Sequence, residues 1–155
     1  MQWRIVVRLI AFAFAMTMVL AGCATAAQRS GAPAPQASAP SAPQLAGTEW
    51  RFASLHGRPV PEDVHATLRF DDQGHASGRA GCNSYGASFL AGGDGALHFD
   101  QMLSTKMACL QPAGAMDTER GVMDALSHTA HARVVRGEMT LLDVTGAAVA
   151  TLQAQ

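Results

Sequence analysis

The sequence predicts a mainly β domain of the α+β class, in which a curved antiparallel sheet or partly open β-barrel of about eight strands carries one packed helix. Two observations support this fold class. Short runs of alternating apolar and polar residues recur from Thr48 to Leu152, separated by turns rich in glycine and aspartate. A single stretch, which begins at Asp117 or Thr118, instead has apolar residues at helical spacing.

The first four predicted strands alternate between inward and outward side chains. They cover residues 48–55, 67–70, 75–80 and 85–91. In the first of them, Trp50 and Phe52 share the inward face. In the third, the inward residues Ala76, Gly78 and Ala80 are all small, which indicates either close approach of another element or a poorly filled interior.

The remaining strands are shorter and follow strong turn signals. They cover residues 96–99, 102–107, 133–135, 138–142 and 147–152. Turn residues join them at Gly92–Gly95, Arg136–Gly137 and Asp143–Gly146. Between the first two strands of the domain, His56–Pro61 is predicted as a turn because its prolines cannot continue a hydrogen-bonded ladder.

One helix is expected between the two groups of strands. Asp117 or Thr118 can cap its start, since their side-chain oxygens accept backbone N–H groups, and Glu119 adds favourable charge in the first turn. The stripe that packs on the sheet consists of Val122, Met123 and Leu126.

The N-terminus has the pattern of a lipoprotein signal. A basic segment, residues 1–8, precedes an apolar run of twelve residues, 9–20, which is short for a membrane span of roughly 20 residues. Leu20-Ala21-Gly22-Cys23 follows and resembles the lipobox of bacterial lipoproteins, in which Cys23 is lipidated with acyl chains such as palmitate. The alternative is an ordinary secretory signal cleaved near Ala27.

The chain therefore divides into three parts. Residues 1–22 form the signal peptide, residues 23–44 the lipidated cysteine and an Ala/Pro/Ser tether too poor in apolar side chains to fold, and residues 45–155 the domain. No aspartate follows Cys23, so resemblance to lipoprotein sorting predicts the periplasmic face of the outer membrane. More than one acyl chain suffices for stable anchoring.

Charge argues against nucleic-acid binding. After loss of the signal, nine basic residues remain against twelve acidic ones, a formal charge of about −3. The single lysine, Lys106, and the scattered arginines form no basic stripe.

We expect a monomer without cofactor or metal. Its partners are the membrane, which it contacts through the lipid anchor, and a protein of the envelope.

Cys82 and Cys109 remain as an even pair in an oxidising compartment, which favours a structural disulfide. A nucleophilic thiol and a metal pair are the alternatives. No base stands near either cysteine in the sequence, and the spacing is not that of a zinc site.

These cysteines lie in segments that resemble the META domain, also called the HslJ-like domain, of heat-shock lipoproteins. The matching segments are Gly47–Trp50, Gly81–Tyr85, Leu97–Phe99, Ser104–Cys109, the helix with Glu119 and Leu126, and Gly137 before Met139–Leu142. The chain departs from the family pattern at Ala87, where glycine is usual, and at Phe89, where tyrosine is frequent.

The resemblance implies an open antiparallel barrel with a packed helix and a disulfide between Cys82 and Cys109. It implies no enzymatic mechanism. Members are linked with envelope stress, heat response and antibiotic tolerance, so we expect a non-enzymatic lipoprotein that acts through protein contacts. The alternatives are a binder of a small apolar ligand in the barrel interior and an inhibitor of an envelope hydrolase.

Asn83, Ser84 and Tyr85 are the candidate recognition loop, because the loop lies beside the disulfide, although asparagine in such a loop more often satisfies the backbone. The remaining polar candidates are weaker. Asp71-Asp72 has a turn context, Ser84 lacks a nucleophile elbow, and the six histidines lack a ligand spacing. No catalytic residue is expected.

Overall fold

The computed structural model describes residues 42–155, which include the whole of the predicted domain, 45–155. The predicted signal peptide, Cys23 and the tether up to residue 41 lie outside the described residues. Among the residues described, none of the helices has the length and apolar character needed to cross a membrane.

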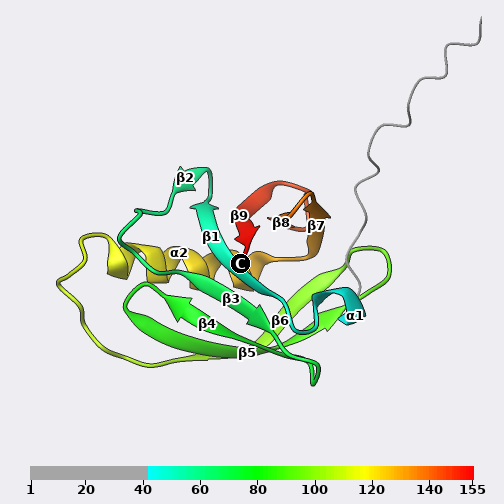
Figure 1. Cartoon of the computed structure of the whole chain (residues 1–155), viewed down its shortest axis with the longest axis horizontal. Helices are drawn as coiled ribbons and strands as arrows, with labels where there is room; N and C mark the ends of the chain where they lie inside the picture. The colour runs from blue at the N-terminus through cyan, green and yellow to red at the C-terminus, as the bar shows by residue number, and fades with distance from the viewer. Residues whose placement is uncertain (1–41) are drawn as a thin grey trace, which may run out of the picture. The chain divides into compact units, whose positions relative to one another are not determined.

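Nine strands form one antiparallel sheet (Figure 1). They are β1 (Glu49–Leu55), β2 (Arg58–Pro59), β3 (Thr67–Phe70), β4 (His75–Ala80), β5 (Asn83–Ala91), β6 (Leu97–Ser104), β7 (His131–Val135), β8 (Glu138–Leu142) and β9 (Ala148–Ala154). Their order is β6-β5-β4-β3-β1-β9-β8-β7, and the short β2 pairs only with β1.

The sheet curls until its two outer strands meet at one end. The Leu97 N–H donates to the Ala130 carbonyl over 3.0 Å, and the Ala132 N–H donates to the Gly95 carbonyl over 2.8 Å. Beyond these bonds β6 and β7 separate, which leaves a curled half-barrel of eight main strands. The predicted fold class is confirmed.

Two helices complete the domain, a single turn α1 (Ala42–Leu45) and the longer α2 (Ala115–His128). Helix α2 contacts strands from both halves of the curled sheet. These are β4 and β6 in one half and β1, β8 and β9 in the other (Figure 1). Its inward residues Val122, Ala125 and Leu126 are completely buried, so the helix closes the open side of the half-barrel.

The interior is filled by side chains. Phe70 is at its centre, with its ring centroid 4.9 Å from that of Phe89 and 6.1 Å from that of Phe99. The largest apolar side chains that are fully buried are Leu45, Phe52, Val64, Leu68, Phe70, Leu97, Val122, Leu126, Met139, Leu141 and Leu152. The small residues of the third predicted strand therefore do not indicate a poorly filled interior, and they no longer support a small ligand there.

The small residues of β4 instead reflect close approach of neighbouring backbone. A Cβ atom on Gly78 would lie 2.0 Å from the Thr67 carbonyl oxygen of β3. Gly81, just after β4, has a left-handed φ of 73°, and a Cβ there would lie 2.4 Å from the Ala115 carbonyl oxygen at the start of α2. Glycine at both positions lets β3 and α2 pack against β4 and the turn that follows it.

Gly78→Ala is expected to lower the free energy of unfolding by about 1–3 kcal/mol, because the new methyl group must displace the Thr67 carbonyl. Urea denaturation followed by circular dichroism measures this loss. Gly86→Ala on the paired strand is the matched control, since the nearest atom to its Cβ is 4.0 Å away. Equal losses in the two variants would contradict the steric explanation.

The strand assignments near prolines and at β6 need correction. Arg58 and Pro59 pair with Leu55 and Ser54, although this segment was predicted as a turn. Proline is compatible with this ladder because β2 is an edge strand, on which no further strand requires its missing N–H. The two strands predicted at 96–99 and 102–107 are one strand, β6, which ends at Ser104.

The start of α2 also differs from the prediction. The helix begins at Ala115 and its N-cap is Gly114, with a left-handed φ of 85° and no side-chain cap. The Thr118 N–H already donates to the Gly114 carbonyl over 2.8 Å, so Asp117 and Thr118 lie inside the first turns. Asp117 supplies the favourable negative charge in the first turn, whereas Glu119 lies beyond it and is buried.

Candidate functional site

The structure joins Cys82 and Cys109 by a disulfide, with their Cα atoms 5.8 Å apart. Cys82 lies in the turn between β4 and β5 and is only 3% exposed, whereas Cys109 lies in the connection from β6 to α2. Neither sulfur is available as a nucleophile or metal ligand in this state. The bond ties the β6–α2 connection to the start of β5.

Asn83, the residue after Cys82, uses both ends of its side-chain amide. Its Nδ2 donates to the Met107 carbonyl over 3.0 Å and to Glu119 Oε2 over 2.7 Å. Its Oδ1 accepts the Thr105 hydroxyl over 2.7 Å and the Met107 N–H over 2.8 Å. An asparagine side chain has two donors and two acceptor positions, so every one of them is occupied.

This hydrogen bonding assigns Asn83 a structural role. The residue is 1% exposed, and no donor or acceptor of its side chain is left for a ligand. It attaches the segment 105–107 to β5 and, through Glu119, to α2. Together with the adjacent disulfide, it holds one stretch of the β6–α2 connection at two neighbouring points.

The candidate recognition loop is not a loop, since Asn83, Ser84 and Tyr85 are the first three residues of β5. Alternation along the strand turns Asn83 and Tyr85 inward and leaves only Ser84 exposed. The Tyr85 hydroxyl donates to the Thr67 carbonyl over 2.8 Å. Burial raises the pKa of this hydroxyl far above its usual range, so Tyr85 remains a neutral donor.

The histidines are all exposed and come from different elements. His128 ends α2 and His131 begins β7, so the helix does not carry both. His56 Nε2 lies 2.9 Å from Asp124 Oδ2, which links the β1–β2 turn to α2. Among residues 42–155, no group of three histidine, cysteine or carboxylate side chains is arranged to hold a metal ion.

The Asp71-Asp72 pair lies in the β3–β4 turn, as its sequence context indicated. Asp71 Oδ1 accepts the His75 N–H over 2.7 Å, and this bond is the main cause that lowers the pKa of Asp71 below its usual value. A general acid at neutral pH requires a raised pKa. Asp71 therefore stabilises the turn as a carboxylate.

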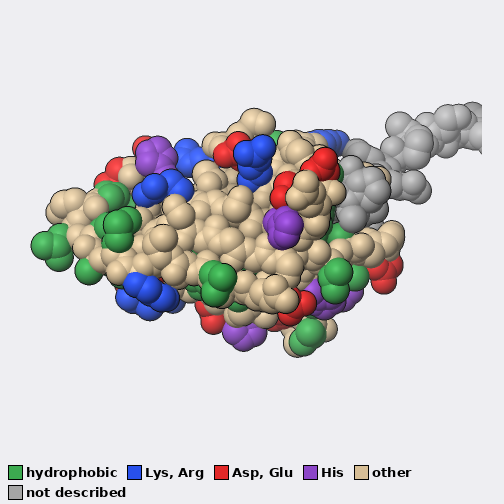
Figure 2. All heavy atoms as spheres, turned by 90° about the horizontal axis from the view of Figure 1, so that it is seen from below, with side chains coloured by type: hydrophobic (Ala, Val, Ile, Leu, Met, Phe, Trp, Pro, Cys, Tyr) green, Lys and Arg blue, Asp and Glu red, His purple; other side chains and the backbone are tan. Residues whose placement is uncertain are grey.

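The segment 103–110, which runs from the end of β6 past Cys109, exposes large apolar side chains. Leu103 is 76% exposed, Met107 56% and Leu110 92%. Figure 2 shows hydrophobic side chains gathered at the end of the domain where, in Figure 1, the connection from β6 to α2 runs. Exposed apolar groups on a segment held at two points are typical of a surface that contacts another protein.

Sequence reasoning missed this surface and the role of Glu119. Alternation from Leu97 and Phe99 would place Leu103 on the inward face, and the sequence does not show the bulge at Gln101 that turns it outward. The one available signal was Leu110 between Cys109 and Gln111-Pro112, an apolar residue placed where the chain cannot continue a strand.

Comparison with known proteins gives one family and two related structures. Residues 43–155 match the family model described as META domain. An NMR structure of a protein from Burkholderia xenovorans aligns with a TM-score of 0.60 at 28% sequence identity, covering 79% of this chain and 96% of that one. A second NMR structure aligns with a TM-score of 0.59 at 19% identity, covering 74% and 94% of the two chains, and supports the fold alone. No curated protein matches the chain significantly.

Proposed function

Since the chain belongs to the META domain family, we propose that it is a non-enzymatic lipoprotein of the outer membrane that supports envelope stress tolerance through contacts with another protein. Cys23 anchors it in the membrane, and the domain faces the periplasm at the end of the 23–44 tether. The lipobox pattern and the apolar run before it support the anchor. Mass spectrometry of the mature N-terminus tests it, and an unmodified chain that begins after Cys23 would contradict it.

The observation that carries the contact hypothesis is the exposed apolar side chains of segment 103–110. Leu103 and Leu110 lie on either side of the two attachment points, the Asn83 hydrogen bonds and Cys109. A segment already ordered in the free protein loses little conformational entropy when it binds. Large apolar side chains on such a segment favour binding, because a partner that covers them removes their surface from water.

The contact hypothesis predicts that the double variant Leu103→Ser/Leu110→Ser loses its partner. The lipidated protein is crosslinked in intact cells, and the crosslinked species is compared between wild type and variant. We expect the crosslinked species to be at least about tenfold less abundant in the variant, because burial of each leucine side chain contributes about 1.5–3 kcal/mol.

The control replaces Leu90 and Val144, which are 69% and 83% exposed on other parts of the domain, by serine. This variant should crosslink as the wild type does. A crosslink that survives equally in both double variants, or is lost equally in both, would exclude segment 103–110 as the contact surface.

A further inference from the structure

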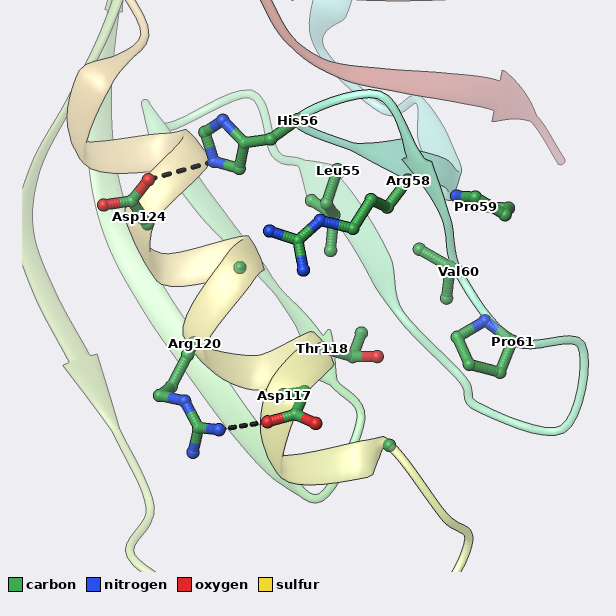
Figure 3. Close-up of a pocket in the computed structure, with 12 residues that line it drawn as sticks. Leu55, His56, Arg58, Pro59, Val60, Pro61, Asp117, Thr118, Arg120 and Asp124 are labelled. Atoms are coloured by element: carbon green, nitrogen blue, oxygen red, sulfur yellow. Dashed lines mark hydrogen bonds and ion pairs between the residues drawn. The ribbon is translucent and has the colours of Figure 1, made fainter.

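A groove of about 690 Å³ lies between the segment 55–61, which includes β2, and helix α2 (Figure 3). It is separate from segment 103–110 in its lining residues. Leu55 forms part of its floor and packs against α2 where Gly121 has no side chain, since a Cβ on Gly121 would lie 3.1 Å from Leu55 Cδ1. Neither the disulfide nor the Asn83 hydrogen bonds contribute to it.

The carboxylates of the groove each have a bonded partner, and one cation does not. Arg120 is bonded to Asp117 on the same helix, and His56 is bonded to Asp124 across one end of the groove (Figure 3). The Arg58 guanidinium projects from β2 towards α2, and among residues 42–155 no hydrogen bond or ion pair engages it (Figure 3). The groove thus presents one cation that has no bonded partner among the described residues.

The wall beside Arg58 is apolar and stiff. Pro59, Val60 and Pro61 form it, and the Val60 N–H donates to the Ala53 carbonyl over 3.0 Å, which fixes this wall to β1. Two prolines further restrict the backbone. A ligand that fits this lining carries an anionic group next to an apolar body.

We propose that this groove binds the free C-terminal carboxylate of a peptide whose last residues are small and apolar. Arg58 receives the carboxylate, since a guanidinium matches the two carboxylate oxygens with two parallel N–H donors. The wall of Pro59, Val60 and Pro61 contacts the side chains that precede it.

The other charges of the groove favour a single negative charge over several. Asp117 and Asp124 both line it, and their carboxylates oppose the approach of a dianion such as phosphate. A peptide carboxylate carries one charge, which matches the one unpaired arginine. The amide N–H groups of a peptide also offer donors to these two aspartates.

The experiment is a titration of the isotopically labelled full chain with the disulfide intact, followed by two-dimensional NMR. The probes are N-acetyl-alanyl-alanine with a free carboxylate, the same peptide with a C-terminal amide, and inorganic phosphate, each up to about 10 mM. We expect saturable shifts at the backbone amides of residues 55–58, Val60 and Gly121 with the free carboxylate, and affinity at least about tenfold weaker with the amide. Phosphate should bind more weakly than the carboxylate peptide.

Arg58→Gln should abolish saturation, and Arg69→Gln on the outward face of β3 is the matched control that should leave it unchanged. The groove variant is expected to fold, because within residues 42–155 no hydrogen bond or ion pair depends on the Arg58 side chain. Equal binding of the acid and amide peptides, stronger binding of phosphate, or binding that persists in Arg58→Gln would each overturn the proposal. The absence of saturable shifts with the acid peptide would do so as well.

Discussion

Asn83→Ala is expected to lower the free energy of unfolding by about 3–5 kcal/mol, because it removes four hydrogen bonds from a buried site at once. The Met107 N–H and carbonyl lose the side chain that satisfies them, each at a cost of about 1–3 kcal/mol where water does not replace it. The Glu119 carboxylate, only 8% exposed, loses its donor as well. Urea denaturation measures the total.

The neighbouring residue provides the control. Ser84→Ala changes an exposed side chain. The two bonds that join this position to Thr105 use the Ser84 N–H and the Ser84 carbonyl, which the substitution keeps. We expect a change within about 0.5 kcal/mol. A loss of less than about 1 kcal/mol in Asn83→Ala would mean that water satisfies the site, and it would remove the structural role assigned here to Asn83.

Asn83→Asp separates the hydrogen bonding from the shape of the side chain. It places a second carboxylate beside Glu119, where the Asn83 Nδ2 now lies 2.7 Å from Glu119 Oε2. Two adjacent carboxylates cannot both ionise without cost, so the pKa of one rises in the folded state. A group with a raised folded pKa stabilises the fold below its unfolded pKa and loses this contribution as pH increases. The variant should therefore be weakest at neutral pH and regain part of its stability on acidification.

The fold could be predicted largely because its strands obey local rules. Trp50 and Phe52 alternate inward as expected, and the hairpin at Arg136–Gly137 follows from a turn in which both residues have positive φ, 50° and 82°. The inaccurate predictions concern positions decided by distant contacts. Gly114 is the N-cap of α2 because the backbone at this position has a left-handed conformation. The neighbouring residues in the sequence do not predict that conformation.

The site could be predicted only in part, again because the fold brings its residues together from distant parts of the sequence. The segments around Cys82 and around Cys109 are each contiguous in the sequence, so their importance was visible. The partnership of Asn83 with Glu119 spans 36 positions and joins a strand to a helix, and no periodicity encodes such a pair. Exposure of Leu103 follows from a bulge in the pairing of β6 with β5, where Gln101 has a positive φ of 52°, so that Leu103 leaves the inward face shared by Leu97 and Phe99. The Arg58 groove likewise exists only once β2 and α2 face each other.

Removal of the disulfide by Cys82→Ala/Cys109→Ala is expected to lower the free energy of unfolding by about 3.5 kcal/mol, the value for the entropy of a loop of about 28 residues. The cysteines are 27 positions apart, and the bond closes all of β5 and β6 into that loop. Dithiothreitol should shift the urea midpoint of the wild type to that of the variant and leave the variant unchanged.

The size of this loss also tests how the two attachments of segment 103–110 act together. The Asn83 hydrogen bonds hold Met107 close to the place where the disulfide holds Cys109, so each keeps the other's partner in position. Residues that share such a segment show coupling energies of about 0.5–3 kcal/mol in double-mutant cycles. We expect the Asn83→Ala loss to be smaller once the disulfide is absent, because the unanchored segment then exposes Met107 to water in both variants. Strictly additive losses would show that the disulfide acts only on the unfolded chain and that the Asn83 hydrogen bonds order the segment without it.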